Sequence, residues 1–220
     1  LNSEIARNAR VENPDRILCS DSLYEEQTLA TLESLELDLL ILAWWPYIIK
    51  KRLLQMPRLG CLNFHPGHLP YTRGKDPNFW ALAQDRPFGV TLNWVDEGID
   101  TGDIAFQSVI GKSWEDTGKT LYQKALKGIV TLFKESFPEI KRGDIPRTPQ
   151  DLSRGSFRKR AELEDGSRIE LDKCYKACNL LNILRARTFR PHPGAWFIDN
   201  GEKYELRVEI TRIDGGRDNN

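Results

Sequence analysis

The stretch LDLLILAWWPYIIKKRLLQMPRLGCLNF, residues 37–64, decides the fold class. It begins with an apolar run at 37–45, which is typical of a strand buried on both faces of a sheet. A helical pattern follows at 46–56, opened by a proline in its first turn, and a second apolar run covers 60–64. Strand, helix and strand in this order predict an α/β protein with a Rossmann-like, mostly parallel sheet flanked by helices.

The same periodicity arguments extend along the rest of the main domain. No apolar strand stands before residues 15–20, so the first strand of the sheet is expected to be missing, either from this piece of chain or from the natural protein. The other predicted elements are helices at 22–36 and 76–86, strands at 88–95 and 104–110, and an amphipathic helix at 116–137 that Pro138 ends.

Composition divides the chain into four parts. Residues 1–140 hold the alternating strands and helices and form the predicted main domain, truncated at its front. Residues 141–168 are rich in Arg, Lys, Gly and Pro and predict a linker or extended arm. Residues 169–212 predict a helix followed by a β-hairpin around the turn DNGE, and 213–220 predict a frayed tail.

The charge balance argues against several classes of partner. Lys+Arg and Asp+Glu are both 32 in 220 residues, so nothing pulls the protein toward nucleic acid or an anionic membrane. No apolar run is long enough to span a bilayer, and the polar start is unlike a secretory signal. The four scattered cysteines predict free thiols, which together with these features favours a reducing cytoplasm. They are Cys19, Cys61, Cys174 and Cys178.

Two polar residues at the end of the second apolar run are the first candidates for chemistry. Asn63 and His65 stand two residues apart on a predicted strand, so their side chains leave the same face. Pro66 and Gly67 end the strand, and ligands of open α/β sheets bind at such strand ends. The alternative is that both side chains only satisfy loop backbone groups. His68 could form a metal pair with His65, but a strand followed by Pro-Gly does not suit that spacing, and no metal is expected.

The motif NFHPGHLPYTRG at 63–74, followed by DEGIDTGD at 96–103, resembles the signature of the folate-dependent formyltransferases. This family includes methionyl-tRNA formyltransferases, glycinamide ribonucleotide transformylases and sugar N-formyltransferases, and the resemblance covers about residues 37–135. It implies the formyltransferase fold. It also implies that Asn63, His65 and Asp100 are the catalytic asparagine, histidine and aspartate.

The implied reaction fits these residue types. A primary amine attacks the formyl carbon of the co-substrate 10-formyltetrahydrofolate and forms a tetrahedral oxyanion. Asn63 can donate its amide N–H to that oxygen, which contributes about 3 kcal/mol at other single oxyanion donors. His65 can take a proton from the amine or stabilise the oxyanion as an imidazolium. Asp100 can orient the imidazole, and the sequence leaves open which of the two is the base.

The resemblance also implies a folate pocket between two loops. The Trp44-Trp45-Pro46 turn stands where the family has a smaller one, directly before the apolar part of this pocket. The implied folate contacts are Ile48, Ile49, Asp96, Glu97, Gly98 and Ile99.

The C-terminal stretch NLLNILRARTFRPHPGAWFIDNGEKYELRV, residues 179–208, is similar to the closing segment of sugar N-formyltransferases. With neutral charge and only some seventy residues after position 150, it favours a nucleotide-linked 4-amino-4,6-dideoxysugar as acceptor, for O-antigen or other surface glycans, over tRNA. A homodimer through this segment is also implied. The acceptor contacts predicted by residue type are Tyr71, Arg73, Arg185, Arg187 and Trp196.

Three other functions stay open at this point. The chain could be a methionyl-tRNA formyltransferase-like enzyme, or a degenerate family member that binds nucleotide or folate without turnover. It could also be a hydrolase that uses Asn63, His65 and Asp100 with water as the acceptor.

Overall fold

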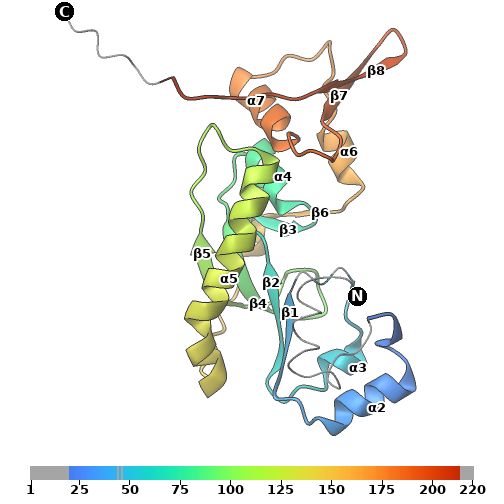
Figure 1. The fold of residues 1–220 in the computed structure, drawn as a ribbon, viewed down its shortest axis with the longest axis vertical. Helices are drawn as coiled ribbons and strands as arrows, with labels where there is room; N and C mark the ends of the chain where they lie inside the picture. The colour runs from blue at the N-terminus through green and yellow to red at the C-terminus, as the bar shows by residue number, and fades with distance from the viewer. Residues whose placement is uncertain (1–19, 44, 46, 214–220) are drawn as a thin grey trace, which may run out of the picture. The chain divides into compact units, whose positions relative to one another are not determined.

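The computed structural model describes residues 20–43, 45 and 47–213 (Figure 1). Trp44, Pro46 and Cys19 therefore lie outside the described residues. The chain divides into two compact units, one formed by 1–40 with 47–61 and the other by 41–46 with 62–220.

The first unit holds two short helices. Helix α2 spans Glu26–Ser34, inside the predicted 22–36, and α3 spans only Lys51–Leu54. Arg52 of α3 joins the two helices, because its guanidinium pairs with Glu26 at 2.9 Å and with Glu33 at 3.1 Å. The prediction of a helix over 46–56 is mostly wrong. Lys50 has an extended backbone (φ −76°, ψ 153°), and the helix begins only at the next residue.

One sheet of four strands runs in the order β1-β2-β4-β5 and belongs mainly to the second unit. The strands are β1 Leu39–Ala43, β2 Gly60–His65, β4 Gly89–Trp94 and β5 Ile104–Val109. Every residue of β4 is buried, as the centre of such a sheet requires. The predicted α/β class is confirmed.

The direction of β4 differs from the mostly parallel sheet that the sequence predicted. β4 pairs antiparallel with both β2 and β5. Between β4 and β5 the chain has only residues 95–103, without a helix, and a parallel crossover needs a dozen or more residues. The short loop therefore forces an antiparallel pair there. In the β2–β4 register, Asn63 lies opposite Asn93 and His65 opposite Thr91.

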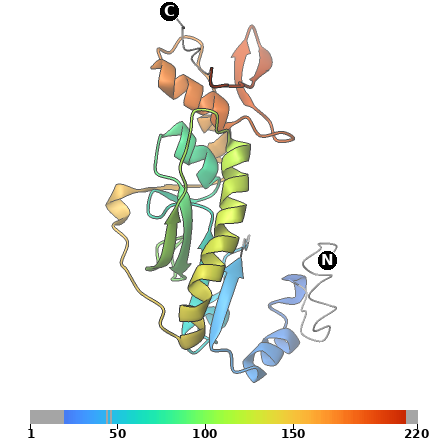
Figure 2. The same ribbon diagram turned by 60° about the vertical axis from the view of Figure 1, so that its left-hand side comes forward.

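Helix α5, Gly118–Arg142, packs against β4 and β5 along its length (Figures 1 and 2). Thr117 caps its start, and the buried stripe is the predicted apolar one. Pro138 does not end the helix, contrary to the prediction. Ile140 is buried at 7% exposure, so one more turn gains core contacts, and Gly143 at φ 81° ends the helix instead.

The C-terminal part of the second unit carries the predicted helix and hairpin. Helix α7, Ala177–Ala186, packs against α4, Pro77–Ala83. Strands β7, Ala195–Asp199, and β8, Glu202–Leu206, pair antiparallel around Asn200 and Gly201, which both have positive φ. Two positive φ values are the mark of the tight turn that an Asn-Gly pair favours.

The predicted arm is not a free linker. Strand β6, Ser156–Arg158, pairs parallel with β3, Thr72–Gly74, and the two lie side by side below α4 in Figure 1. A one-turn helix η3, Leu152–Arg154, precedes β6 and a short helix α6, Glu162–Gly166, follows it. Among the described residues, no helix is both long and apolar enough to cross a membrane.

Candidate active site

Three of the predicted site residues converge at the end of β2. Asn63 and His65 leave the same face of the strand, and the loop between β4 and β5 brings Asp100 to them. The amide Nδ2 of Asn63 lies 3.5 Å from Asp100 Oδ1, and the ring Nδ1 of His65 lies 3.4 Å from Asp100 Oδ2. An amide, an imidazole and a carboxylate thus lie within contact distance of one another in the second unit.

The environment of His65 fixes which ring nitrogen can exchange a proton. The side chain is 4% exposed, and its Nε2 lies 2.7 Å from the carbonyl oxygen of Thr72. A carbonyl oxygen only accepts, so Nε2 carries the hydrogen and Nδ1 is the nitrogen that can gain or lose a proton. Gly67 leaves the space for this ring, because an added Cβ would stand 2.6 Å from His65 Nε2.

The backbone around Asp100 holds its carboxylate toward His65. Asp100 itself is left-handed at φ 54°, a conformation that Asp tolerates better than most residues. The backbone N–H of Gly74 donates to Asp100 Oδ2 at 2.8 Å. Earlier in the loop, Asp96 Oδ1 accepts hydrogen bonds from Gly98 N at 3.0 Å and Thr101 Oγ1 at 2.7 Å. Hydrogen bonds from within the loop to the Asp96 side chain therefore stabilise the conformation of the loop.

The arm supplies a residue to this site that the sequence did not indicate. The side-chain Nε2 of Gln150 donates to the carbonyl of Asp100 at 3.0 Å and to that of Gly102 at 2.6 Å. Two residues earlier, Thr148 forms an isolated bridge with Ile104, so the arm runs beside the loop. Gln150 acts through its side chain on backbone groups of the loop, and its residue type carries no sign of such a role.

The predicted folate contacts fall in both units. Ile48 and Ile49 belong to the first, where Ile48 is 76% exposed and Ile49 is buried. Asp96, Glu97, Gly98 and Ile99 belong to the second and form the exposed part of the loop before Asp100. Their role toward folate stays a prediction. For Asp96 the structure adds an internal role in closing that loop.

Two predicted acceptor contacts, Tyr71 and Arg73, lie next to the catalytic cluster. Tyr71 OH accepts a hydrogen bond from Arg154 Nη2 at 2.6 Å, and Arg73 Nη2 donates to the carbonyl of Leu152 at 3.4 Å. Both side chains are half-buried and directly precede Gly74, which binds the Asp100 carboxylate.

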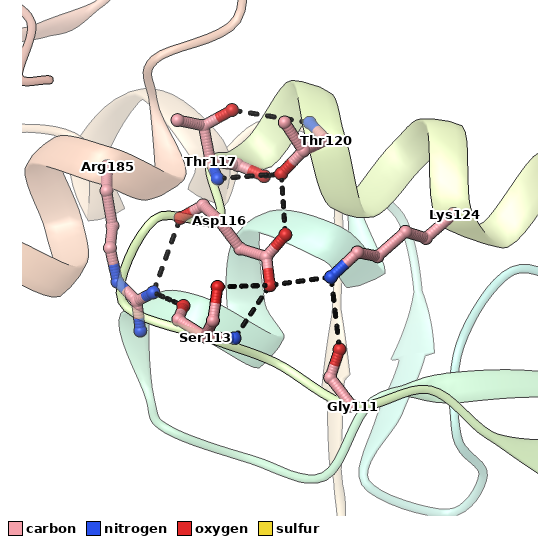
Figure 3. Close-up of polar contacts among 7 residues, drawn as sticks. All are labelled: Gly111, Ser113, Asp116, Thr117, Thr120, Lys124 and Arg185. Carbon is pink, nitrogen blue, oxygen red and sulfur yellow. Dashed lines mark hydrogen bonds and ion pairs between the residues drawn. The ribbon is translucent and has the colours of Figure 1, made fainter. Parts of the chain in front are cut away.

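Of the other acceptor contacts predicted from residue type, Arg185 and Trp196 have internal partners and Arg187 is buried. Figure 3 shows Arg185 on α7 reaching the loop before α5, where its Nη1 donates to the carbonyls of Ser113 and Asp116. Arg185 is 5% exposed and Arg187 is 7% exposed, so neither guanidinium faces solvent. Trp196 donates from Nε1 to the carbonyl of Glu164. These contacts favour structural roles over acceptor binding.

Asp116 is the centre of the cluster in Figure 3. Its carboxylate accepts from Lys124 Nζ at 2.8 Å, from Ser113 N at 2.7 Å and from Thr120 Oγ1 at 2.9 Å. Burial by itself would raise the pKa of Asp116, but these hydrogen bonds outweigh it and hold the pKa below its usual value. With the Arg185 contacts, the cluster attaches α7 to the start of α5.

His68 stands apart from the catalytic cluster. Its ring packs against Tyr71 with centroids 5.7 Å apart, and burial lowers the pKa of its imidazole. Within the part of the chain that the structure describes, no group of three or more His, Cys, Asp or Glu side chains could hold a metal ion. Cys61 is a buried free thiol, and Cys174 and Cys178 are exposed free thiols.

Two segments of the chain match models of known protein families. A model described as formyl transferase matches residues 4–134, and a model described as N-formyltransferase dimerization C-terminal domain matches residues 162–212.

Similar proteins fall into two groups. A methionyl-tRNA formyltransferase of Carboxydothermus hydrogenoformans is 28% identical over 87% of this chain. The chain spans only 50% to 64% of the length of three such curated relatives. Among solved structures, a 4-N formyltransferase from Francisella tularensis is 25% identical with a TM-score of 0.75, over 88% of this chain and 82% of its own. This likeness confirms the formyltransferase fold.

A second solved structure carries ligands. The formyltransferase PseJ from Anoxybacillus kamchatkensis, in complex with UDP-4,6-dideoxy-4-formamido-L-AltNAc and tetrahydrofolate, is 30% identical with a TM-score of 0.56. The match covers 69% of this chain and 74% of that one.

Proposed function

The chain belongs to the formyl transferase family, and on that premise we propose that it transfers a formyl group from 10-formyltetrahydrofolate to an amine. The observation that carries the proposal is the convergence of Asn63, His65 and Asp100 at the end of β2. These are the residues that the family resemblance assigns to catalysis, and their chemistry suits attack of an amine on a formyl carbon.

The roles follow from the observed geometry. Asn63 Nδ2 donates to the oxygen of the formyl group as it becomes an oxyanion. His65 exchanges the proton of the amine through Nδ1, because Nε2 is held by Thr72. Asp100 lies beside Nδ1 and stabilises positive charge on the ring. The formyl carbon bonds to the amine nitrogen, its bond to N10 of the folate breaks, and the proton that the amine gives up to His65 or Asp100 passes to N10 of the departing tetrahydrofolate.

We propose a nucleotide-linked 4-amino-4,6-dideoxysugar as the acceptor, for the synthesis of O-antigen or other surface glycans in the cytoplasm. Support comes from the match of the C-terminal part to an N-formyltransferase model and from the likeness to PseJ, which holds a formamido sugar nucleotide. The same model supports a homodimer formed through residues 162–212. Sedimentation of the full chain at several concentrations tests the dimer.

Methionyl-tRNA is the second candidate acceptor. The observation that favours this acceptor is that the curated relatives reported above are methionyl-tRNA formyltransferases. One experiment separates the candidates. The full chain is incubated with 10-formyltetrahydrofolate and either a panel of amino sugar nucleotides or charged initiator tRNA. Mass spectrometry then identifies which acceptor gains one formyl group. Formylation of the tRNA alone would overturn the sugar assignment, and formylation of neither would overturn the proposed activity.

A further inference from the structure

The pairing of β3 with β6 gathers cations that lie far apart in the sequence. Two come from the turn that contains β3, and four come from the arm around β6. We call these six residues the β3–β6 cation patch. They are Arg73, Lys75, Arg154, Arg158, Lys159 and Arg160. The faces of the strands alternate, so Arg73 shares a face with Phe157, whereas Arg158 leaves the opposite face and lies 4.5 Å over the Trp80 ring.

Most of this charge is not neutralised within the protein. Arg158 pairs with Glu162 at 3.5 Å, and Arg160 lies 3.9 Å from Asp76. The other four cations of the patch make no ion pair with any carboxylate of residues 20–43, 45 and 47–213. The carboxylate of Asp151, the acid nearest in sequence to Arg154, accepts from Ser153 N and Oγ. Unpaired cations held together attract an anion.

Two of the unpaired guanidinium groups lie over the same short segment. Arg154 donates to Tyr71 OH at 2.6 Å, and Arg73 reaches back to the carbonyl of Leu152 at 3.4 Å. The Nε of Arg73 is buried without a hydrogen-bond partner in the described structure. The next residue, Gly74, donates to Asp100. An anion held by these two arginines would therefore lie close to the proposed catalytic carboxylate.

An exposed aromatic ring lies beside the arginines. Phe157 is the register partner of Arg73 in the parallel β3–β6 pair, so both side chains leave the same face. Phe157 is 37% exposed, and its ring edge lies 2.9 Å from the point where a Cβ on Gly74 would stand. A half-exposed ring on the same face as the Arg73 side chain suits a flat base attached to phosphates.

We propose that Arg73 and Arg154 of the β3–β6 cation patch bind the diphosphate of the nucleotide that carries the acceptor, with Phe157 against the base. The inference deepens the proposed function and rests on it, because it assigns the part of the acceptor that the catalytic cluster does not touch. The patch is confined to two three-residue strands and the segments next to them. The two arginines that lie over one segment, Arg73 and Arg154, suit two phosphates better than the six to ten contacts of an extended nucleic-acid backbone.

Calorimetric titration of the full chain with uridine diphosphate and thymidine diphosphate tests the site. The variants are Arg73→Gln and Arg154→Gln, with Lys127→Gln on the exposed side of α5 as the charge-matched control. Loss of one charged hydrogen bond in either variant should raise the dissociation constant of the nucleotide about 10-fold. The control should change it less than about twofold. Phe157→Leu should weaken both nucleotides but not inorganic pyrophosphate.

Several results would overturn the inference. One is the absence of nucleoside diphosphate binding to the wild-type chain. Another is equal affinity in the Arg154→Gln variant with an unchanged melting temperature. A third is loss of tRNA binding in that variant while nucleotides never bind, which would assign the patch to RNA.

Kinetics separates the inference from the proposed function. If the wild-type chain formylates an amino sugar nucleotide, Arg154→Gln should raise KM for that acceptor about 10-fold and leave kcat and the KM for folate nearly unchanged. An unchanged acceptor KM would reject the cation patch and leave the activity standing. Nucleotide binding that depends on Arg154, in a chain that formylates nothing, would reject the activity and support the patch.

Discussion

Residues 61–74 and residues 146–158 both build the candidate site, but in different ways. The first segment contributes reactive groups, since Asn63 and His65 project from β2. The second contributes no reactive group to the cluster. It follows the loop and the turn beside β2 and bonds mostly to their backbones, as Gln150 does with the carbonyls of Asp100 and Gly102.

This difference teaches what a sequence makes visible. An asparagine and a histidine beside Pro-Gly are unusual residue types in an unusual place, so they stand out. A glutamine in an Arg- and Pro-rich arm does not. The first segment should therefore control the chemical step, whereas the second should control how well the acidic loop is held for that step.

The largest effect is expected for His65→Asn, which tests the reactive segment directly. The variant keeps a polar side chain but loses the only group of that residue that can exchange a proton. kcat should fall about 100- to 10,000-fold while the KM for folate changes little. Steady-state kinetics with the accepted amine measures both. His192→Asn, at an exposed histidine in the C-terminal part, is the control and should keep full activity. Near-normal kcat in His65→Asn would remove the histidine from the mechanism.

A somewhat smaller loss is expected for Asn63→Ala. Removing one oxyanion donor should lower kcat about 100- to 1,000-fold, because the developing negative charge loses a positioned N–H. Asn179→Ala, at an exposed position of α7, is the matched control. A rise in KM with unchanged kcat would show that Asn63 only binds the substrate.

The arm is tested by Gln150→Ala. The loop around Asp100 loses two hydrogen bonds of about 1 kcal/mol each, so its carboxylate is less well placed and kcat should fall about 10-fold. The dependence of kcat on pH should change as well, because the contact between Asp100 and His65 is loosened. Gln123→Ala, exposed on α5, is the control. If Gln150→Ala lowered only the melting temperature, the arm would be a structural support without influence on the site.

The smallest effect on rate, and a clear effect on stability, is expected for Asp116→Asn. The cluster of Figure 3 lies outside the catalytic group, so kcat should change less than about twofold. The free energy of unfolding should fall by about 2 kcal/mol, since the part-buried contacts from Lys124 and Ser113 lose a charged acceptor. Thermal melting at neutral pH should show a decrease of about 4–8 °C.

The pH dependence of that decrease has a definite sign. The folded pKa of Asp116 is depressed, so its contribution to stability is complete above the pKa of about 4 of an unfolded aspartate. It is lost as the pH falls through the lower folded pKa. The difference between wild type and Asp116→Asn should therefore shrink below about pH 4. Asp144→Asn, which breaks an exposed pair with Arg142, should change the melting temperature little at any pH. A constant difference at all pH values would mean that the charge of Asp116 contributes nothing.

Local patterns predicted most of the elements but not their directions. The apolar runs gave β1, β2, β4 and β5, and the Asn-Gly pair gave the hairpin turn. The antiparallel direction of β4 was not predicted, because the prediction used the alternation of strands and helices and did not consider that the connection between β4 and β5 is too short for a parallel crossover. Helix α5 extends beyond Pro138 because burial of Ile140 rewards the extra turn, and burial is a tertiary property.

The candidate site shows the same division. Residue type and spacing were sufficient for Asn63, His65 and Asp100, which the structure brings together. Residue type was misleading for Arg185, whose guanidinium binds carbonyls of the loop before α5. The sequence pattern around an arginine in a C-terminal helix is the same whether its side chain faces a ligand or a neighbouring loop. The sequence therefore could not distinguish these two roles for Arg185.

The sequence by itself determined the α/β class, the family and the candidate cluster of Asn63, His65 and Asp100, because these depend on periodicity and on rare combinations of residue types. Only the tertiary structure decided three other features. It placed Gln150 beside the acidic loop, set His65 Nε2 against the carbonyl of Thr72, and brought Arg154 of the arm to the Tyr71–Arg73 segment. Each of these is a contact between residues distant along the chain. Such contacts use backbone groups and common side chains that carry no mark in the sequence, so only the fold can assign them.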